Sequence, residues 1–475
     1  MNIGKTSTVV FICKIIGSIF SFVAMIYFAR LLGSGVIGQY SLILALVAWL
    51  QLIGKMGVAT ALKKRLSEGD DRPQFLTTGL LLIFVISIPV LITLFLLSNP
   101  LSSYMGASYL FLVFVFPISM FFVYVESALK GDHKVHLFGI LYPSRKITQS
   151  IIQLALVFFL GFGLTGMVVG YGVAAVLVGI FGLYLLKPEF NMPRKHHFES
   201  IFSYAKYSWM GSLKSRSYND ADILILGIFV SPSLVGIYAI AWTIASFMNI
   251  FGEAISNALF PEISFQSSNS QQERVSKLVS LSLSYTGLMI IPGLVGAAII
   301  GENLLLLYGD EFVFGTKVLV LLVLCCAIYG YQKQLLNALN AIDRPDLSLK
   351  SNFIFIISNI SLNIILISQF SLVGAAVATL ISASLGSIIS YYYLNRLIEI
   401  TFPFKSVLNQ SFAALLMGGV VFGIHNMDPI SYYNIPNTVY VILIVTFGAV
   451  LYFSLLIFLW KEFRMNVMKN IPQLI

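Results

Sequence analysis

Charged side chains interrupt several long apolar stretches of this sequence, and they are the groups best able to do chemistry there. Lys14 and Lys55 each lie in an apolar run that has no carboxylate nearby. A third run is interrupted at 213–222 by the segment LKSRSYNDAD. A charge at the centre of a bilayer costs about 2.5–3.5 kcal/mol, so such residues usually face a cavity or a partner. The pattern predicts a site for an anionic, polar ligand, because lysine and arginine supply the counter-charge.

Each of these groups also has a purely structural interpretation. Arg216 and Asp220 are four residues apart, so they can pair with each other on a helix. Lys14 and Lys55 are about two turns from a span end and can extend to the inner membrane surface. Arg30 fits an anchor at the outer interface, and a substrate contact is the alternative. Both interpretations stay open for every one of these residues.

A further polar face is predicted on the helix that contains Asn249, Glu253 and Asn257, which are spaced i, i+4, i+8. The candidate substrate-binding residues are Lys14, Arg30, Lys55, Lys214, Arg216 and Asn249. The candidates for gating or ion coupling are Asp220, Asp222 and Glu253.

The composition indicates which elements position these side chains. Of 475 residues, 58% are hydrophobic and only 10% are charged, whereas a soluble chain has about 25% charged residues. A soluble enzyme, a disordered chain and a disulfide scaffold are therefore excluded. The three cysteines lie in apolar runs and the histidines are scattered, so no metal site and no cofactor are predicted. The remaining class is an all-α, polytopic membrane protein.

Fourteen apolar runs are long enough to cross a bilayer as helices. Their approximate limits are 9–32, 37–62, 76–98, 108–129, 146–162, 165–187, 200–230, 234–260, 277–300, 314–340, 351–370, 372–395, 405–425 and 437–460. Lysine and arginine crowd the loops on one side, which predicts that both termini are cytoplasmic. The net charge of +9 is then a topology signal, and no nucleic-acid partner is predicted. No outer loop is long enough for a catalytic domain, so the chain is not expected to be an enzyme.

The two halves of the chain resemble each other in order, which is typical of transporters. The matched segments are Gly38-Gln39-Tyr40 with Gly236-Ile237-Tyr238, Ile88-Pro89 with Ile291-Pro292, Ala128-Leu129 with Ala338-Leu339, and Leu164-Thr165-Gly166 with Leu372-Val373-Gly374. The repeat predicts pseudo-symmetric six-helix lobes at 1–197 and 198–400, followed by two extra helices and a cytoplasmic tail at 401–475. It also matches Lys55 with Glu253, and we hypothesise that these two residues form an inner gate. The alternative is that Glu253 pairs with Lys214 or Arg216 on the neighbouring seventh span.

Several stretches carry a resemblance to a known family. They are ARLLGSGVIGQYSL at 29–42, GVATALKKRLSEG at 57–69, DILILGIFVSPSLVGIYAIA at 222–241, LLYGDEF at 306–312 and ALNAIDRPDLSLKSN at 338–352. The chain resembles the Wzx-type oligosaccharide-lipid flippases of the multidrug/oligosaccharidyl-lipid/polysaccharide exporter superfamily. The resemblance implies that the first, second, seventh and eighth spans line a central cavity. It also implies alternating-access transfer of a polyprenyl- or dolichyl-phosphate-linked oligosaccharide from the cytoplasmic to the outer leaflet, for surface polysaccharide or glycoprotein glycan assembly.

The resemblance implies a location in a prokaryotic plasma membrane, with membrane lipids, a glycan polymerase and glycosyltransferases as partners. A proton or sodium gradient is the hypothetical energy source. The alternative within the superfamily is a cation-coupled multidrug antiporter, which uses carboxylates in its N-terminal lobe. The first two spans here contain Lys14, Arg30 and Lys55 but no Asp or Glu. This charge sign favours an anionic substrate.

Overall fold

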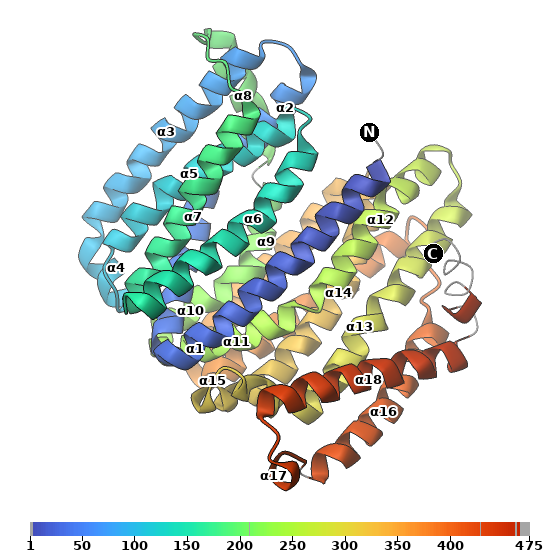
Figure 1. Cartoon of the computed structure of the whole chain (residues 1–475). Coiled ribbons are helices and arrows are strands. Elements are labelled where there is room, and N and C mark those ends of the chain that lie inside the picture. Colours follow the sequence, from blue (N-terminus) through green and yellow to red (C-terminus); the bar gives the residue numbers. More distant parts are fainter. Residues whose placement is uncertain (1–2, 209, 428, 461–462, 466–475) are drawn as a thin grey trace. The chain divides into compact units, whose positions relative to one another are not determined.

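The computed structural model describes residues 3–208, 210–427, 429–460 and 463–465. Within these ranges every regular element is a helix (Figure 1). Nine helices of the described part are long and apolar enough to cross a membrane. The pair α11 (Pro232–Ser246) and α12 (Asn249–Ser268), bent by 43°, makes a tenth if it is counted as one span. The predicted all-α, polytopic membrane fold is confirmed.

The chain divides into two compact units, Met1–Gly236 and Ile237–Ile475. The first unit contains α1 (Ile3–Lys55), α2 (Val58–Glu68), α3 (Arg72–Leu96), α4 (Ser98–Met105), α5 (Leu110–Gly131), α6 (Val135–Leu154), the π-helical η1 (Ala155–Phe159), α7 (Gly163–Leu186), α8 (Lys195–Ser208), α9 (Met210–Arg216), the π-helical η2 (Ser217–Ala221), α10 (Asp222–Phe229) and the first turn of α11. The lobe limits predicted from the repeat stay a prediction.

Three of the predicted spans differ from the helices of the first unit. α1 breaks at Gly33, whose φ is 78°, and this break agrees with the predicted limits of the first two spans. The second span is the first of the three that differ. It ends at Lys55 and not at 62, because Met56 and Gly57 have φ of 39° and 80°. The helix at the fifth predicted span, α6, begins at Val135, eleven residues before 146, and it is not one of the nine helices of the described part that are long and apolar enough to cross a membrane. The seventh, predicted as one run over 200–230, is divided among α8, α9, η2 and α10.

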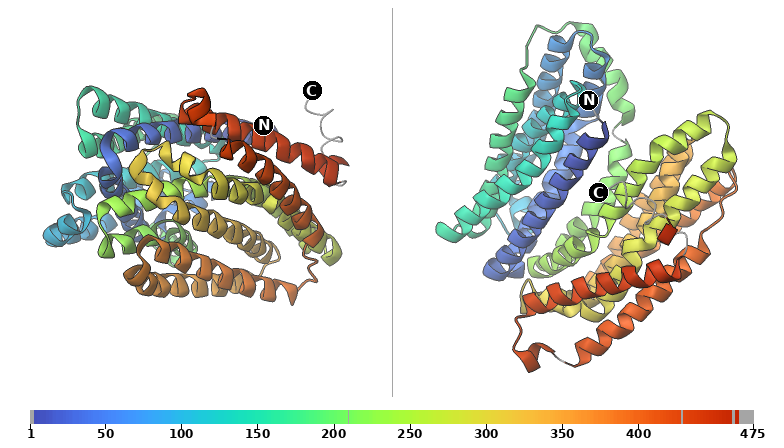
Figure 2. Two further views of the ribbon diagram at one scale, coloured as in Figure 1. Left: turned by 90° about the horizontal axis from the view of Figure 1, so that it is seen from below. Right: turned by 45° about the vertical axis from the view of Figure 1, so that its right-hand side comes forward.

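The second unit contains the rest of α11, α12, α13 (Gln272–Leu306), the 3-10 helix η3 (Asp310–Gly315), α14 (Thr316–Ala341), α15 (Pro345–Asn395), α16 (Phe404–Asn426), α17 (Pro429–Tyr433) and α18 (Asn437–Leu459). α15 holds two spans that meet at Ser371, whose φ is 52°, between the predicted limits 370 and 372. α16 and α18 lie side by side and both pack on α13 (Figure 2). They are the two extra helices that the sequence predicts.

The turns that follow α5 and α14 have the same backbone conformation. His133 and Asp343, at the centre of each turn, have φ of 57° and 56°. In both turns, N–H groups after the helix donate to the carbonyls of the Ala-Leu pair that the sequence repeat matches. These bonds are Asp132 N to Ala128 O, Lys134 N to Leu129 O, Ile342 N to Ala338 O and Arg344 N to Leu339 O. At this matched pair of positions the two halves therefore share one backbone conformation.

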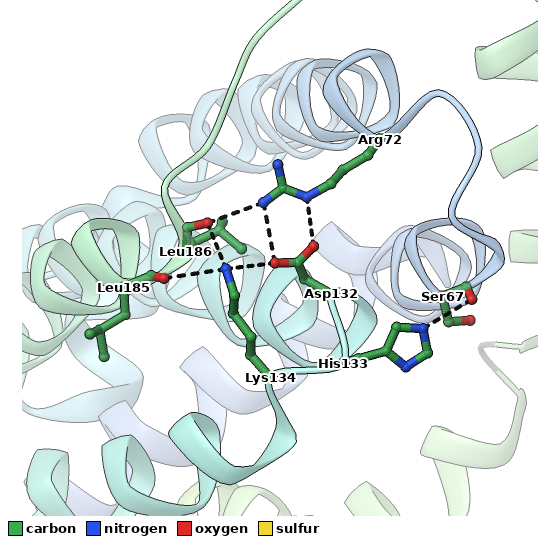
Figure 3. A network of polar contacts seen from close by, with 7 residues as sticks. All are labelled: Ser67, Arg72, Asp132, His133, Lys134, Leu185 and Leu186. Atoms are coloured by element: carbon green, nitrogen blue, oxygen red, sulfur yellow. Dashed lines mark hydrogen bonds and ion pairs between the residues drawn. The ribbon is translucent and has the colours of Figure 1, made fainter.

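A polar network at the first of these turns joins three helices of the first unit (Figure 3). Arg72, at the start of α3, donates from Nε to Asp132 Oδ1 at 2.6 Å. Lys134 pairs with Asp132 Oδ2 at 2.8 Å. Arg72 and Lys134 also donate to the carbonyl of Leu186 at the end of α7, each at 3.1 Å. Burial alone would raise the pKa of Asp132, but hydrogen bonds from Arg72 and Lys134 outweigh it and lower that pKa.

The first turn of α11 lies directly against the second half of α1. A Cβ atom on Gly38 would be 1.7 Å from the carbonyl oxygen of Pro232, and one on Gly236 would be 2.0 Å from the carbonyl oxygen of Ser34. The hydroxyls of Ser34 and Ser233 form a hydrogen bond beside this contact. Only glycine at both positions lets the two backbones approach this closely. Residues 232–236 therefore complete the packing of the first unit.

Candidate substrate-binding site

The polar segment 213–222 forms the end of α9, the π-helical η2 and the start of α10. Arg216 Nη1 lies 3.1 Å from Asp220 Oδ2, so the pairing expected from their spacing is present. Lys214 and Asp222 are both buried, with 6% and 4% exposure. A π-helical turn is rare and frequently marks a functional site. The polar segment that interrupts the seventh apolar run thus contains a π-helical turn.

Lys55 is the last residue of α1, and its side chain is half-buried. It interacts electrostatically with Arg216 of α9 and with Glu126 and Lys130 of α5. Glu126 and Lys130 are ion-paired one helical turn apart. α1 packs on both α5 and α9. This packing gathers a cluster of three cations and one carboxylate around the end of α1, which we call the Lys55 cluster (Lys55, Glu126, Lys130 and Arg216).

Arg145 is a second cationic group, and the sequence analysis missed it. Its guanidinium lies 4.6 Å from the ring centre of Phe122 in α5 and 4.7 Å from that of Tyr171 in α7. Both helices are candidate membrane spans. A guanidinium held between two aromatic rings is attracted by the π-electrons of both. Its Nε is buried and has no hydrogen-bond partner among the described residues, so it retains a donor for a ligand.

A column of polar groups continues along α6 from Arg145. Gln149 and Gln153 follow at i+4 and i+8, on the same helix face. Their Nε2 atoms donate to the hydroxyl of Tyr40 in α1 at 3.2 Å and 2.9 Å. Gln153 also donates to the carbonyl of Met167 in α7 at 2.6 Å. We call Arg145, Gln149, Gln153 and Tyr40 the α6 column.

The limit predicted for the fifth span explains why Arg145 was not among the candidates. The span was predicted to begin at 146, so Arg145 and Lys146 were placed at its inner end and counted as evidence for topology. In the structure both lie in the middle of α6, and Lys146 is half-buried. The spacing Arg145, Gln149, Gln153 was the signal that could have identified the column.

Two further candidates lie on the first half of α1. Arg30 is exposed and precedes the break at Gly33 by three residues. Lys14 belongs to α1, but its side chain lies outside the described residues. Gly17, on the face predicted for Lys14, packs against Pro143 of α6, where a Cβ would be 3.3 Å from the Pro143 Cα. That face of α1 thus approaches the helix that holds the α6 column.

In the second unit, the candidates on α12 contact α14. Asn249 donates from Nδ2 to Cys326 Sγ at 3.5 Å. Glu253 Oε1 pairs with Lys333 Nζ at 2.7 Å, although the Glu253 side chain is 58% exposed. The partners predicted for Glu253 were Lys55 or, alternatively, Lys214 or Arg216, whereas Lys333 was interpreted only as a structural or gating residue. The Lys55–Glu253 gate joins residues of different units and stays a prediction.

Known proteins resemble this chain in sequence and in fold. A family model described as polysaccharide biosynthesis protein matches residues 3–267, and one described as lipid II flippase MurJ matches residues 219–440. A probable flippase, AglR, of Haloferax volcanii is 34% identical and 94% of each chain is covered. A probable low-salt glycan biosynthesis flippase, Agl15, of the same organism is 26% identical over 100% of both chains. A solved structure of lipid II flippase MurJ in an inward closed conformation has a TM-score of 0.78 at 17% identity, covering 95% of this chain and 98% of that one. At this identity the last likeness shows a shared fold.

Proposed function

The chain belongs to the family of polysaccharide biosynthesis proteins, and from this premise we propose that it flips a lipid-linked oligosaccharide from the cytoplasmic to the outer leaflet. It is a multi-pass membrane transporter, in agreement with relatives that are named flippases. The observation that carries the proposal is the concentration of cations between helices of the first unit. These are Lys55 and Arg216 in the Lys55 cluster and Arg145 in the α6 column.

A lipid-linked sugar presents a phosphate, a polar glycan and a long apolar tail. The phosphate needs counter-charges once it leaves water, and arginine offers a planar fork of donors for its oxygens. Amides and hydroxyls, such as those of Gln149 and Tyr40, suit sugar hydroxyl groups. The tail remains in the lipid. The task is to shield the head group from hydrocarbon during alternating access, and no covalent step is needed.

The remaining candidates have parts in the same proposal. Lys14, Arg30, Lys214 and Asn249 contribute further contacts to the head group in a central cavity. Asp220, Asp222 and Glu253 control gating or coupling to a proton or sodium gradient. Both termini are cytoplasmic, in a prokaryotic plasma membrane. Glycosyltransferases supply the substrate on that side, and a glycan polymerase or transferase consumes it on the other.

The proposal can be tested in proteoliposomes that contain the purified chain and a fluorescent polyprenyl- or dolichyl-phosphate-linked sugar. Flipping is measured as the fraction of head groups that a membrane-impermeant quencher reaches over time. We expect the protein to accelerate flipping and a deletion strain without paralogues to lose surface glycan. No acceleration, or normal surface glycan in that strain, contradicts the proposal. Acceleration of an organic cation instead of the anionic lipid supports the multidrug alternative.

The role of Lys55 is tested in the same assay. Losing one charge-assisted contact of about 1.5–3 kcal/mol should slow flipping about 10–100-fold in Lys55→Ala. Lys55→Arg should retain more activity, since it keeps the charge. The matched control is Lys195→Ala, because the Lys195 side chain is 90% exposed on α8. Full activity in Lys55→Ala would make Lys55 an anchor at the membrane surface.

A further inference from the structure

Three metal-ligating side chains meet at a place that the proposed flipping function does not use. Asp71 lies in the turn between α2 and α3, and His196 and His197 lie in the first turn of α8. His197 Nε2 is 3.2 Å and His196 Nε2 is 3.6 Å from Asp71 Oδ2. One ligand atom from each residue lies within 4.8 Å of the other two. All three residues belong to the first unit.

We propose that Asp71, His196 and His197 bind one divalent transition-metal ion of the zinc type. Zinc lies about 2.0–2.2 Å from nitrogen and carboxylate ligands, so donors at tetrahedral angles are about 3.4 Å apart. The two distances to Asp71 bracket this value. Two imidazoles and one carboxylate select borderline ions such as Zn²⁺, Ni²⁺ or Cu²⁺ over Mg²⁺ and Ca²⁺, which prefer oxygen ligands.

The surroundings of His197 resemble the outer shell of a metal-binding histidine. Its side chain is 2% exposed and its ring meets the edge of Phe75, with centres 5.0 Å apart. Its Nδ1 lies 3.2 Å from the carbonyl oxygen of Arg194. A ligating histidine usually donates its second N–H to such a carbonyl, which fixes the ring and leaves Nε2 for the metal.

The carboxylate of Asp71 lies beside both histidines, at the start of α3. Its φ of 48° is in the left-handed region, which aspartate adopts more readily than most residues. It occupies the N-cap position of α3, where an aspartate normally accepts a backbone N–H. No such side-chain bond is present. The carboxylate faces the histidines instead.

A hydrogen-bonded cluster without metal is the competing interpretation. The N–H of Arg194 lies 2.9 Å from His197 Nδ1. If Nδ1 accepts from it, Nε2 carries the proton and donates to Asp71. Metal binding needs the other tautomer, with Nδ1–H donating to the Arg194 carbonyl. Only the second arrangement leaves Nε2 of His197 without a proton and able to bind a metal ion.

A bound ion would connect the chain that leaves α7 and enters α8 to the α2–α3 turn. α8 packs on α2 and α3, and it leads into α9 and the Lys55 cluster. The ion would add to this packing a bond that depends on metal concentration. The site would thus hold the segment before α9 in one position on the first unit.

The test uses the full chain in detergent with an affinity tag that lacks histidine. After treatment with a chelator, ZnCl2 is titrated, bound zinc is counted by mass spectrometry, and CoCl2 is used as a spectroscopic probe. We expect one zinc per chain and an upward shift of the thermal midpoint with zinc. His196→Gln should weaken binding by at least the 10–100-fold typical of losing a supporting group, and it should remove the midpoint shift. Because His196 is 55% exposed, this variant should fold.

Matched controls separate the site from general histidine binding. His133 is an exposed histidine whose Nε2 lies 3.3 Å from the Ser67 carbonyl, so His133→Gln should bind zinc as the parent does. Asp71→Asn should lose binding even if His197→Gln fails to fold. Zinc binding that is equal in parent, His196→Gln and Asp71→Asn would overturn the proposal. Absence of stoichiometric zinc in the parent would leave a hydrogen-bonded cluster only, and would also overturn it.

Discussion

The turns after α5 and α14 have the same backbone conformation but different side chains. In the first, Asp132 accepts from Arg72 and pairs with Lys134, and its side chain is only 16% exposed. In the second, Ile342 packs against an apolar cluster, and the nearby Arg344–Asp346 pair is exposed at 40% and 52%. The two matched turns therefore share a backbone conformation, while the buried charge lies in the turn of the first unit.

The same contrast extends into the helices. The first unit places cations between its helices, as the Lys55 cluster and Arg145 show. In the second unit two buried amides join helices, since Gln334 donates to the Gly252 carbonyl at 3.0 Å and Gln410 to the Ser284 carbonyl at 2.7 Å. Its ion pair of Glu253 with Lys333 joins α12 to α14. Neutral hydrogen bonds hold helices together without attracting an anion. The comparison predicts that the first unit binds the substrate and the second chiefly supplies a stable scaffold.

The largest effect is expected at Gly38. A Cβ there would overlap the Pro232 carbonyl, and overpacking costs about 1–3 kcal/mol even where side chains can yield. Backbone cannot move aside as a side chain can, so Gly38→Ala should lose most folded protein in size-exclusion chromatography and lower the thermal midpoint. Gly35→Ala is the control, since a Cβ at Gly35 meets nothing within 4 Å. A stable Gly38→Ala variant would show that the first unit does not need residues 232–236 so close.

The next largest effects are expected for Arg145→Ala in the first unit and Gln334→Leu in the second, which should change flipping and stability in opposite proportions. Arg145→Ala should slow flipping at least about 10-fold while the thermal midpoint changes little, because a charged contact to the substrate is lost. Gln334→Leu in the second unit should do the reverse. It should cost about 0.5–1.5 kcal/mol of stability, with flipping per folded molecule retained. If the two variants behaved alike, the proposed division between the units would be wrong.

Charge reversal at Glu253 tests which partner this carboxylate needs. Glu253→Lys would face Lys333, its partner at 2.7 Å, and like charges repel. We expect partial loss of flipping, recovered by the double variant Glu253→Lys with Lys333→Glu. Recovery by Glu253→Lys with Lys55→Glu instead would support the gate between the repeat-matched residues. If neither double variant recovered activity, Glu253 would have a partner other than these two lysines.

A smaller, pH-dependent effect is expected at the polar network of Figure 3. Hydrogen bonds from Arg72 and Lys134 lower the pKa of Asp132. Its stabilisation is therefore present above the unfolded pKa of about 3.9 and is lost as the pH falls through the folded value. Asp132→Asn should lower the thermal midpoint at pH 7, and the difference from the parent should shrink as the pH falls below 4. A constant difference across this range would contradict a role for the charge.

The smallest effect is expected at the matched turn of the second unit. Asp346 is exposed and pairs with Arg344 at 3.0 Å, and exposed pairs contribute little to stability. Asp346→Asn should therefore leave the thermal midpoint unchanged at pH 7. A shift as large as that of Asp132→Asn would remove the contrast between the two turns.

Local sequence patterns predicted the elements well. Long apolar runs identified the membrane helices, and the breaks at Gly33 and Ser371 fall between predicted spans. The spacing of Arg216 and Asp220 correctly indicated that they can pair. In each case the information lies within one helix, where hydrophobicity and helical period determine the outcome.

Contacts between distant segments could not be predicted. Asp71 is far in sequence from His196 and His197, and nothing in either segment indicates the other. Lys333 pairs with Glu253 because α14 packs on α12. The sequence of either helix alone does not indicate this packing. Arg145 lies between Phe122 and Tyr171 because α5 and α7 pack against α6, which the sequence does not indicate. Such residues are revealed only when the fold brings neighbouring helices together.

The contact between Gly38 and Gly236 has a consequence for biogenesis. A chain emerging from the ribosome inserts α1 long before the first turn of α11 has been synthesised. The contact of Gly38 with Pro232 must therefore wait for a segment far along the chain. Packing of the first unit cannot finish until residues 232–236 have been synthesised.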